Sequence, residues 1–344
     1  MNRNMLFFTL IFISIIVLVM LNLALGTVSI PLADIWNILL GKNDESQIIW
    51  QNIVWKSRFP QTITALVAGM GLSISGLQMQ TVFRNPLAGP SELGISSGAS
   101  LGVATIILLS GSISGRALSR MGFIGEMAIT ISAIIGAMAV MAIILTISQR
   151  VRGNVVLLIM GVMIGYIATA IIGVLKFFSN DEDVRAYVIW GLGSFSKVSG
   201  NQVYTFVIIM AILIPLSFLL IKTLNLMLLG DNYARNLGLN VKRARLTVIA
   251  CSCVLTAIIT AYCGPIVFLG LAVPHLCRTI FSTSNHIVLV PAVTLTGAAL
   301  ALFCNLVARM PGFEGALPIN SVTALIGAPI VISVLFGKRK NEIN

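Results

Sequence analysis

The sequence predicts an all-α polytopic membrane protein with about ten transmembrane helices. Of its 344 residues, 57% are hydrophobic and only 10% are charged, whereas soluble domains carry about 25% charged residues. The mean hydropathy is +1.00. Apolar runs of about 20 residues recur along the chain, and each is long enough for a helix to cross a bilayer. A membrane β-barrel is disfavoured because its strands alternate in polarity over about ten residues.

The apolar runs are expected to form a single transmembrane domain that covers residues 1–344. The first run is longer than the apolar core of a signal peptide, about 7–15 residues, and no A-x-A cleavage site follows it, so we expect it to be retained as a span. The eighth is short and interrupted by prolines, which predicts a broken or re-entrant helix. The ten runs lie at 5–25, 60–82, 93–110, 121–148, 154–175, 202–221, 246–262, 266–280, 287–308 and 318–336.

The distribution of charge predicts the orientation of the chain in the membrane. Ten spans put both termini on one side, and the basic tail Lys338–Arg339–Lys340 places that side in the cytoplasm. Most acidic residues then fall on the outer side. The formal net charge of +11 is spread over the ends of the apolar runs, which is the pattern of a membrane protein and not of a nucleic-acid-binding protein.

Two outer connections carry polar or aromatic residues. Residues Pro31–Leu40 are expected to form a short interfacial helix, with tryptophans of this connection at headgroup depth. Lys56 and Arg58 end the same connection, and from the residues alone an outer-leaflet lipid anchor is the favoured interpretation. The acidic run Asn180–Arg185 is expected to be a solvated loop, because three consecutive carboxylates do not converge on a metal ion.

The connection between the second and third runs reads FRNPLAGPSELGISSGASLG, residues 83–102. Its prolines are expected to end the second helix, and Ser91 is a candidate N-cap for the third. Gly94, Gly98 and Gly102 recur every four residues, a spacing that lets two helices approach closely. Close helix packing and a groove for a substrate are both compatible with this stripe.

A polar, basic island at about 222–245 separates the sixth and seventh runs. Within it, a helix of about two turns is expected, with Asp231 as N-cap and Gly238 as the stop. Such a short helix is marginal in water by itself, so we expect other parts of the protein to support it. A docking element for a soluble cytoplasmic partner and a basic loop on anionic lipid headgroups are the two interpretations. The residues expected to share one face of this helix are Tyr233, Ala234 and Leu237.

The chain lacks the motifs of an energy-converting or metal enzyme. It contains no G-x-x-x-x-G-K-[ST] phosphate loop and no H-E-x-x-H motif. The five cysteines lie in or beside apolar runs without a spaced pair, which indicates neither a disulfide framework nor a metal site. His275 and Arg278 lie three residues apart at the inner end of the eighth run, where a structural role is more common than a proton relay. Carboxylates within the runs are nearly absent, although ion-driven carriers usually keep one, so the energy source is expected outside this chain.

Four stretches together resemble the FecCD-like permease subunits of type II ABC importers for iron-siderophores, haem and cobalamin. They are RNPLAGPSELGISSGASLG at 84–102, LGDNYARNLGLNVKRAR at 229–245, GPIVFLGLAVPHLCR at 264–278 and LPINSVTALIGAP at 317–329. The resemblance implies two permease copies around a central pathway, which we expect to be a homodimer. It also implies two ABC ATPase subunits that bind ATP and Mg²⁺ beneath, an extracytoplasmic binding protein above, and neither a cofactor nor an enzyme activity in this chain.

The resemblance also implies roles for particular residues. Residues 231–238 match the helix that seats in the ATPase groove, and the outer cations match arginines that pair with carboxylates of the binding protein. This sequence departs from the family pattern at Gln61, where a second arginine is common, and at Ala316, where an acid is common and Glu314 stands two residues earlier. The residues implied for ATPase coupling are Asp231, Ala234, Arg235, Leu237 and Gly238; for docking, Lys56, Arg58 and Arg309; for helix packing or the pathway, Arg84, Asn85, Pro86, Gly94, Gly98, Gly102, Asn154, Pro274, His275 and Arg278.

A different class remains open from the residues alone. An ion-coupled secondary carrier of organic metabolites would use the irregular eighth run as its binding site. Uptake that follows a proton gradient without an ATPase would favour this alternative. An intramembrane enzyme has less support, because the sequence shows no paired nucleophile and base. No cluster of aromatic or charged residues identifies the transported solute.

Overall fold

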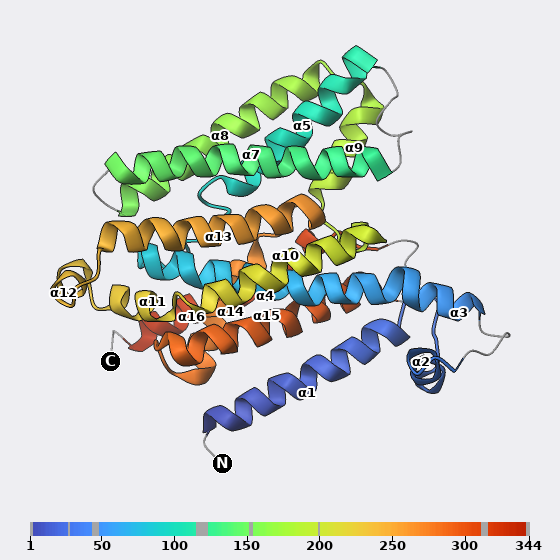
Figure 1. Ribbon diagram of the computed structural model, residues 1–344, viewed down its shortest axis with the longest axis horizontal. Helices are drawn as coiled ribbons and strands as arrows, with labels where there is room; N and C mark the ends of the chain where they lie inside the picture. The colour runs from blue at the N-terminus through green and yellow to red at the C-terminus, as the bar shows by residue number, and fades with distance from the viewer. Residues whose placement is uncertain are drawn as a thin grey trace.

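The computed structural model describes residues 3–26, 28–42, 48–114, 123–150, 154–198, 200–310 and 316–341. These residues form helices and connecting turns, without a strand (Figure 1). Predictions that concern residues 151–153 or Glu314 lie outside the described residues. The helices are α1 (Arg3–Ala24), α2 (Leu32–Leu39), α3 (Ile48–Ile53), η2 (Val54–Arg58), α4 (Phe59–Phe83), α5 (Ile95–Ser114), α7 (Phe123–Arg150), α8 (Asn154–Phe177), α9 (Asp181–Gly191), η3 (Phe195–Lys197), α10 (Asn201–Phe218), α11 (Ile221–Leu228), α12 (Asp231–Asn236), α13 (Val241–Cys263), α14 (Phe268–Phe281), α15 (His286–Ala308) and α16 (Ile319–Asn341).

Each of the ten predicted apolar runs coincides with a helix. Within the described residues, seven helices are long and apolar enough to cross a membrane, and three apolar stretches are shorter, in α5, α14 and α16. The helix α14 has 14 residues, or about 21 Å at 1.5 Å per residue, which is less than the hydrocarbon core of about 30 Å. The eighth run is therefore short, as predicted, but Pro274 lies inside a continuous helix and does not break it.

The helix α4 lies at the centre of the molecule and is buried along most of its length. It packs against α10, α13, α14 and α15, while α5, α7 and α8 form a neighbouring group joined to the centre mainly through α13 (Figure 1). The core is one large cluster of aliphatic and small side chains drawn from nearly all of these helices. The last turn of α4 is therefore surrounded by other elements on several sides.

The glycine stripe of α5 serves close helix packing. A Cβ atom on Gly102 would lie 2.0 Å from the carbonyl oxygen of Ser132 in α7, and one on Gly98 would lie 2.7 Å from the carbonyl oxygen of Gly136. Gly94 precedes α5 with a φ of +79° and faces Gly161 of α8. The N-cap prediction for Ser91 is wrong, because α5 begins at Ile95 and the Ser91 carbonyl instead accepts the N–H of Gly94 in the preceding turn.

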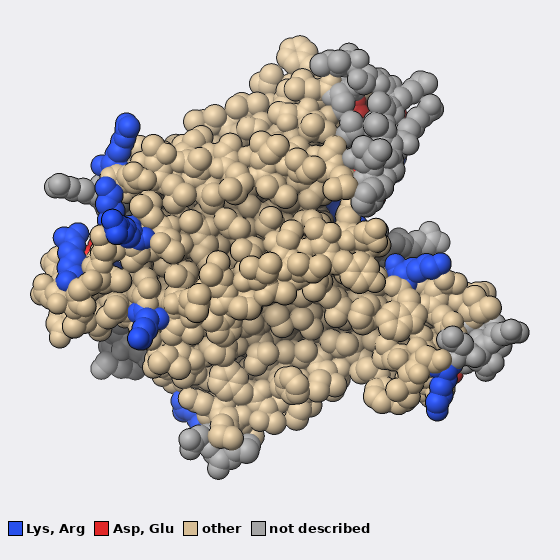
Figure 2. Space-filling model, viewed as in Figure 1, with Lys and Arg blue, Asp and Glu red and all other residues tan. Residues whose placement is uncertain are grey.

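The charged side chains gather at the two ends of the helix bundle. Figure 2 shows Lys and Arg at the end that carries α12 and at the opposite end near α2 and α10, with a wide uncharged surface between them. We call the first the α12 end. We call the second the α9 end, because α9 lies there as well (Figure 1). The helix α1 begins and α16 finishes at the α12 end (Figure 1), so the first and last described residues lie at the same end of the bundle.

One outer connection differs from its prediction. The acidic run from Asn180 is not a loop, because Asp181 begins α9, a helix of 11 residues. Three acids, Asp181, Glu182 and Asp183, occupy its first turn, where negative charge interacts favourably with the helix dipole. The interfacial helix predicted at Pro31–Leu40 is present as α2, Leu32–Leu39.

Candidate functional site

The basic island of residues 222–245 folds mainly into helices at the α12 end. It holds most of α11, all of α12 and the start of α13. The helix α12 has six residues and ends as predicted at Gly238, whose φ is +85°. The Gly238 N–H donates to the Arg235 carbonyl at 2.9 Å and the Leu239 N–H to the Ala234 carbonyl at 3.0 Å, the bond pair of a Schellman C-cap.

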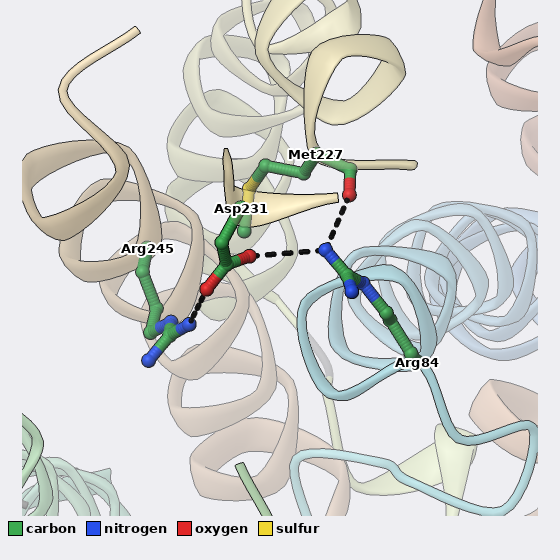
Figure 3. A network of polar contacts seen from close by, with 4 residues as sticks. All are labelled: Arg84, Met227, Asp231 and Arg245. Atoms are coloured by element: carbon green, nitrogen blue, oxygen red, sulfur yellow. Dashed lines mark hydrogen bonds and ion pairs between the residues drawn. The ribbon is translucent and has the colours of Figure 1, made fainter. Parts of the chain in front are cut away.

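The carboxylate of Asp231 ties α12 to two other elements, as Figure 3 shows. Arg84, which ends α4, donates to Oδ1 at 3.0 Å, and Arg245 of α13 donates to Oδ2 at 2.9 Å. Arg84 also donates to the Met227 carbonyl of α11 at 3.1 Å. The N-cap prediction for Asp231 is wrong: Gly230 precedes the helix, and Asp231 is its first residue. Its side chain therefore links three helices and does not cap its own.

Two apolar side chains are exposed on α12 and the turn after it. Tyr233 and Leu237 are 60% and 54% exposed, whereas Ala234 is fully buried. The prediction that these three residues share one face is therefore wrong, because Ala234 packs inward while the other two, four residues apart, are neighbours on the outside. Arg235 is also exposed. An anchored helix thus presents a small apolar pair with a cation beside it.

A second set of hydrogen bonds joins this region to α4. The His286 Nδ1 lies 2.9 Å from the Asn225 Oδ1 of α11, and its Nε2 lies 2.9 Å from the Thr81 Oγ1 of α4. The His286 N–H also donates to Asn225 Oδ1 at 2.8 Å. Sequence reasoning missed these three residues, because Thr81 and His286 are 205 positions apart and no local motif connects them.

The same turn of α4 also contacts α14. Arg278 donates to Gln80 Oε1 at 2.6 Å, and the Gln80 amide donates to the Leu271 carbonyl at 3.2 Å. Pro274 and His275 are buried within α14. Through Gln80, Thr81 and Arg84, one end of α4 therefore contacts α11, α12, α14 and α15.

The turn after α4 has a well-defined backbone. Arg84 adopts a left-handed conformation with a φ of +49°, and the Asn85 Oδ1 accepts the Leu87 N–H at 2.9 Å across Pro86, an Asx turn. This turn places the Arg84 side chain toward α12. Asn154, predicted near a gate, is the first residue of α8.

At the α9 end, Arg58 is not at the surface. It is 1% exposed, and its guanidinium donates to the carbonyls of Leu23 at 2.6 Å, Ala24 at 2.8 Å and Val28. Leu23 and Ala24 are the last residues of α1, whose terminal carbonyls lack partners within the helix. The prediction of an exposed docking cation is therefore corrected for Arg58, which caps α1.

The other outer cations differ in exposure. Lys56 is exposed and Arg309 is partly buried, with its Nη2 and that of Arg58 both close to Gly26. Burial and the positive charge of Arg58 lower the pKa of Arg309 to about 10, so Arg309 stays cationic at pH 7. Gln61, which stands where a second arginine is common in the family, is buried and donates to the Asn305 side chain at 2.9 Å. This position therefore does not belong to the exposed surface.

Comparisons with known proteins match nearly the whole chain. The model of the FecCD transport family matches residues 14–337. The hemin transport system permease protein HmuU of Yersinia pestis is 35% identical over 344 residues, covering 99% of this chain and 97% of HmuU. The vitamin B12 import system permease protein BtuC of Klebsiella pneumoniae is 34% identical over 290 residues, covering 84% of each.

A solved structure supports the same relationship. It is described as a metal-chelate type ABC transporter in an inward-facing conformation, and it is similar with a TM-score of 0.82 and 27% identity. The match covers 96% of this chain and 99% of that one. The fold is thus shared along nearly the whole length of both chains.

Proposed function

This chain belongs to the FecCD transport family, and from that membership we propose that it forms one half of the pathway of an ATP-driven importer for metal chelates. The relatives named for hemin and vitamin B12 support haem or cobalamin as the chelate, and the family resemblance adds iron-siderophores. A second copy of the chain completes the pathway as a homodimer. An ABC ATPase binds each copy at the α12 end, which faces the cytoplasm together with both termini of the cell-membrane protein.

The observation that carries the proposal is the exposed apolar pair on α12. Tyr233 and Leu237 are more than half exposed at the α12 end of the bundle, where Lys and Arg side chains gather (Figure 2). Hot spots of protein interfaces are enriched in Tyr, Trp and Arg side chains that seat in well-packed pockets of the partner. A groove on a soluble ATPase would cover this pair, and Arg235 beside it would supply a polar rim.

The contacts behind α12 explain how a docked ATPase could act on the spans. Asp231 binds Arg84 of α4 and Arg245 of α13, and the His286 network joins α11 to α4. A movement of α12 therefore displaces the end of α4, which packs against the central helices. Only interactions that differ between the two states of the pathway can drive the switch, and these bonds are our candidates for that difference.

The opposite end carries the proposed docking surface for the binding protein. Lys56 is exposed and Arg309 is partly exposed, and both are cationic partners for carboxylates. ATP and Mg²⁺ are held by the ATPase, so no cofactor is proposed for this chain. Arg58 contributes indirectly by holding the end of α1.

Reconstitution tests the proposal. The chain, an ABC ATPase and a chelate-loaded binding protein are placed in liposomes, and chelate uptake is measured with ATP, without ATP and with a non-hydrolysable analogue. Uptake only with hydrolysable ATP is the expected result. Uptake that follows a proton gradient in the absence of the ATPase would contradict it, and would favour the secondary-carrier alternative, which no comparison supports. Mass spectrometry of the ligand retained by the complex identifies the chelate.

A further inference from the structure

A small cavity lies at the α9 end, remote from α12. Its volume is about 260 Å³, and it is open on one side. Elements from both parts of the bundle surround it: α5, α7, α9, η3, α10 and α13. Four of its lining residues are polar or charged, namely Glu126, Thr130, Lys197 and Gln202, and the others are apolar or aromatic.

The mouth of the cavity is polar and carries one charge of each sign. Glu126 lies in the first turn of α7, and Gln202 is the second residue of α10 and donates to Glu126 Oε2 at 3.2 Å. Lys197 donates to the carbonyls of Ile189 and Trp190, each at 3.1 Å. Because an ammonium has three N–H donors, these two bonds leave one for a ligand. Burial lowers the pKa of Lys197 to about 8, so the group is still mostly cationic at pH 7.

The other residues that line the cavity are mainly apolar or aromatic. Ile107 lies seven residues before the end of α5 at Ser114, or about 10 Å along the helix. Ile129 of α7 and Ala261 of α13 also line the cavity. Trp190 and Tyr262 also line the cavity, and such side chains favour the headgroup boundary of a bilayer. The lining therefore combines charged, aromatic and aliphatic side chains, which are the kinds of group that a lipid headgroup and the start of its acyl chains contact.

We propose that this cavity binds one phospholipid of the outer leaflet whose headgroup combines a phosphate with an ammonium group. The phosphate accepts the remaining N–H of Lys197, the ammonium pairs with the Glu126 carboxylate, and the upper acyl chain covers Ile107, Ile129 and Ala261. The charges of the mouth match those of such a zwitterionic headgroup. At about 260 Å³, below the usual range of pockets for drug-sized ligands of about 300–1,000 Å³, the cavity holds the headgroup and the start of one chain, and the rest of the lipid lies outside it.

Such a lipid would join the two parts of the bundle at the α9 end. The group of α5, α7 and α8 meets the central helices mainly through α13, and the cavity lies on the same boundary. A bound lipid adds contacts from α7 and α9 to α10 and α13. It thereby stabilises the relative position of the two groups, and this effect does not depend on the identity of the transported chelate or on an ATPase.

Native mass spectrometry of the purified full chain tests the proposal. Delipidated protein is titrated with phosphatidylethanolamine or phosphatidylglycerol, and the fraction that retains one lipid is measured for wild type, Lys197→Met and Glu126→Gln. We expect Lys197→Met to weaken binding of both lipids about tenfold. We expect Glu126→Gln to weaken phosphatidylethanolamine binding severalfold and to leave phosphatidylglycerol binding unchanged or stronger, because only the former lipid carries the ammonium.

Lys176→Met is the matched control. Lys176 lies in the last turn of α8 at the same end of the bundle, where it stacks on the Tyr187 ring, and it does not line the cavity. Its variant should retain lipid as wild type does. Because Lys197 also binds the last carbonyls of α9, each variant is checked by thermal unfolding, and the exposed Glu126 provides a test that does not disturb the fold. Equal retention of both lipids by wild type and Glu126→Gln, or by wild type and a folded Lys197→Met, would overturn the proposal and indicate only annular lipid.

Discussion

Arg84 and Asp231 form an ion pair of 3.0 Å between the end of α4 and the start of α12, across 147 positions of sequence. The pair is open to solvent, with side-chain exposures of 45% and 37%. Exposed ion pairs of this kind stabilise a fold by only about 0.2–1 kcal/mol. The ion pair contributes mainly to the position of α12. Asp231 also binds Arg245, so one carboxylate fixes a helix that is too short to be stable by itself.

Replacing Asp231 with Asn should therefore impair transport more than stability. The amide keeps the shape of the carboxylate but loses the charge that holds both arginines. We expect the thermal unfolding temperature to change little and ATP-driven uptake in proteoliposomes to fall about tenfold, equivalent to about 1.4 kcal/mol. Asp34→Asn, at the α9 end of the bundle, serves as the control. A variant that transports at the wild-type rate would show that the two ion pairs are not required.

Replacing Leu237 with Asp should weaken binding of the ATPase. The side chain is 54% exposed and lies next to Tyr233, so the substitution has little effect on folding but places a charge in the proposed apolar contact. Loss of a hot-spot anchor costs about 2 kcal/mol or more, which corresponds to roughly 30-fold weaker association. Co-purification with the ATPase measures it, and Leu219→Asp tests whether any exposed leucine has this effect. Equal recovery of the ATPase with wild type and Leu237→Asp would exclude this contact surface.

Replacing Gly238 with Val should disturb the end of α12, whereas Asn should be tolerated. The φ of +85° at Gly238 is unfavourable for residues with a Cβ, by about 1–2 kcal/mol, and Asn is the usual alternative to Gly at this cap. No atom lies within 4 Å of a Cβ built there, so the effect comes from the backbone and not from a steric clash. We expect Val to raise the ATP hydrolysed per chelate imported severalfold and Asn to leave it near wild type. Identical ratios for Val and Asn would contradict this role.

Much of the fold was predictable because membrane spans follow directly from hydropathy. All ten apolar runs became helices, and the stop at Gly238 followed from the conformational freedom of glycine. The helix α9 was missed, since the acids Asp181–Asp183 resemble a solvated loop although they also stabilise the first turn of a helix. The local sequence does not distinguish these two outcomes.

The site was less predictable, because it depends on contacts between distant residues. The importance of residues 231–238 came from motif resemblance, but Asp231 was expected to cap its own helix and instead binds Arg84 and Arg245. Similarly, Arg58 stands just before a span, where a basic residue usually faces headgroups. The carbonyls that it binds belong to α1, and only the packing of α1 beside α4 brings them within reach.

Replacing Arg58 with Met should destabilise the protein. The side chain is 1% exposed, and its removal leaves the carbonyls of Leu23 and Ala24 buried without the charged donor. Hydrogen bonds to charged groups contribute about 1.5–3 kcal/mol, so we expect the free energy of unfolding to fall by about 2–4 kcal/mol. Chemical denaturation in detergent measures it. Lys42→Met, an exposed cation at the same end, is the control, and an unchanged unfolding free energy in Arg58→Met would refute the capping role.

Lys56 provides the test of the docking surface at the α9 end. It is exposed, and a charge at the rim of an interface acts mainly on the association rate and its salt dependence. Lys56→Glu should therefore slow association with the binding protein severalfold at low salt, and the difference from wild type should shrink as the ionic strength rises, because exposed charges are screened beyond about 10 Å at 0.1 M salt.

Arg309→Met should weaken the complex at every salt concentration, since Arg309 is partly buried and keeps its charge below its pKa of about 10. Surface plasmon resonance with the permease in nanodiscs separates the two effects, and Lys42→Glu controls for general charge. If Lys56→Glu and Lys42→Glu slow association equally, net charge and not a defined docking residue governs the encounter.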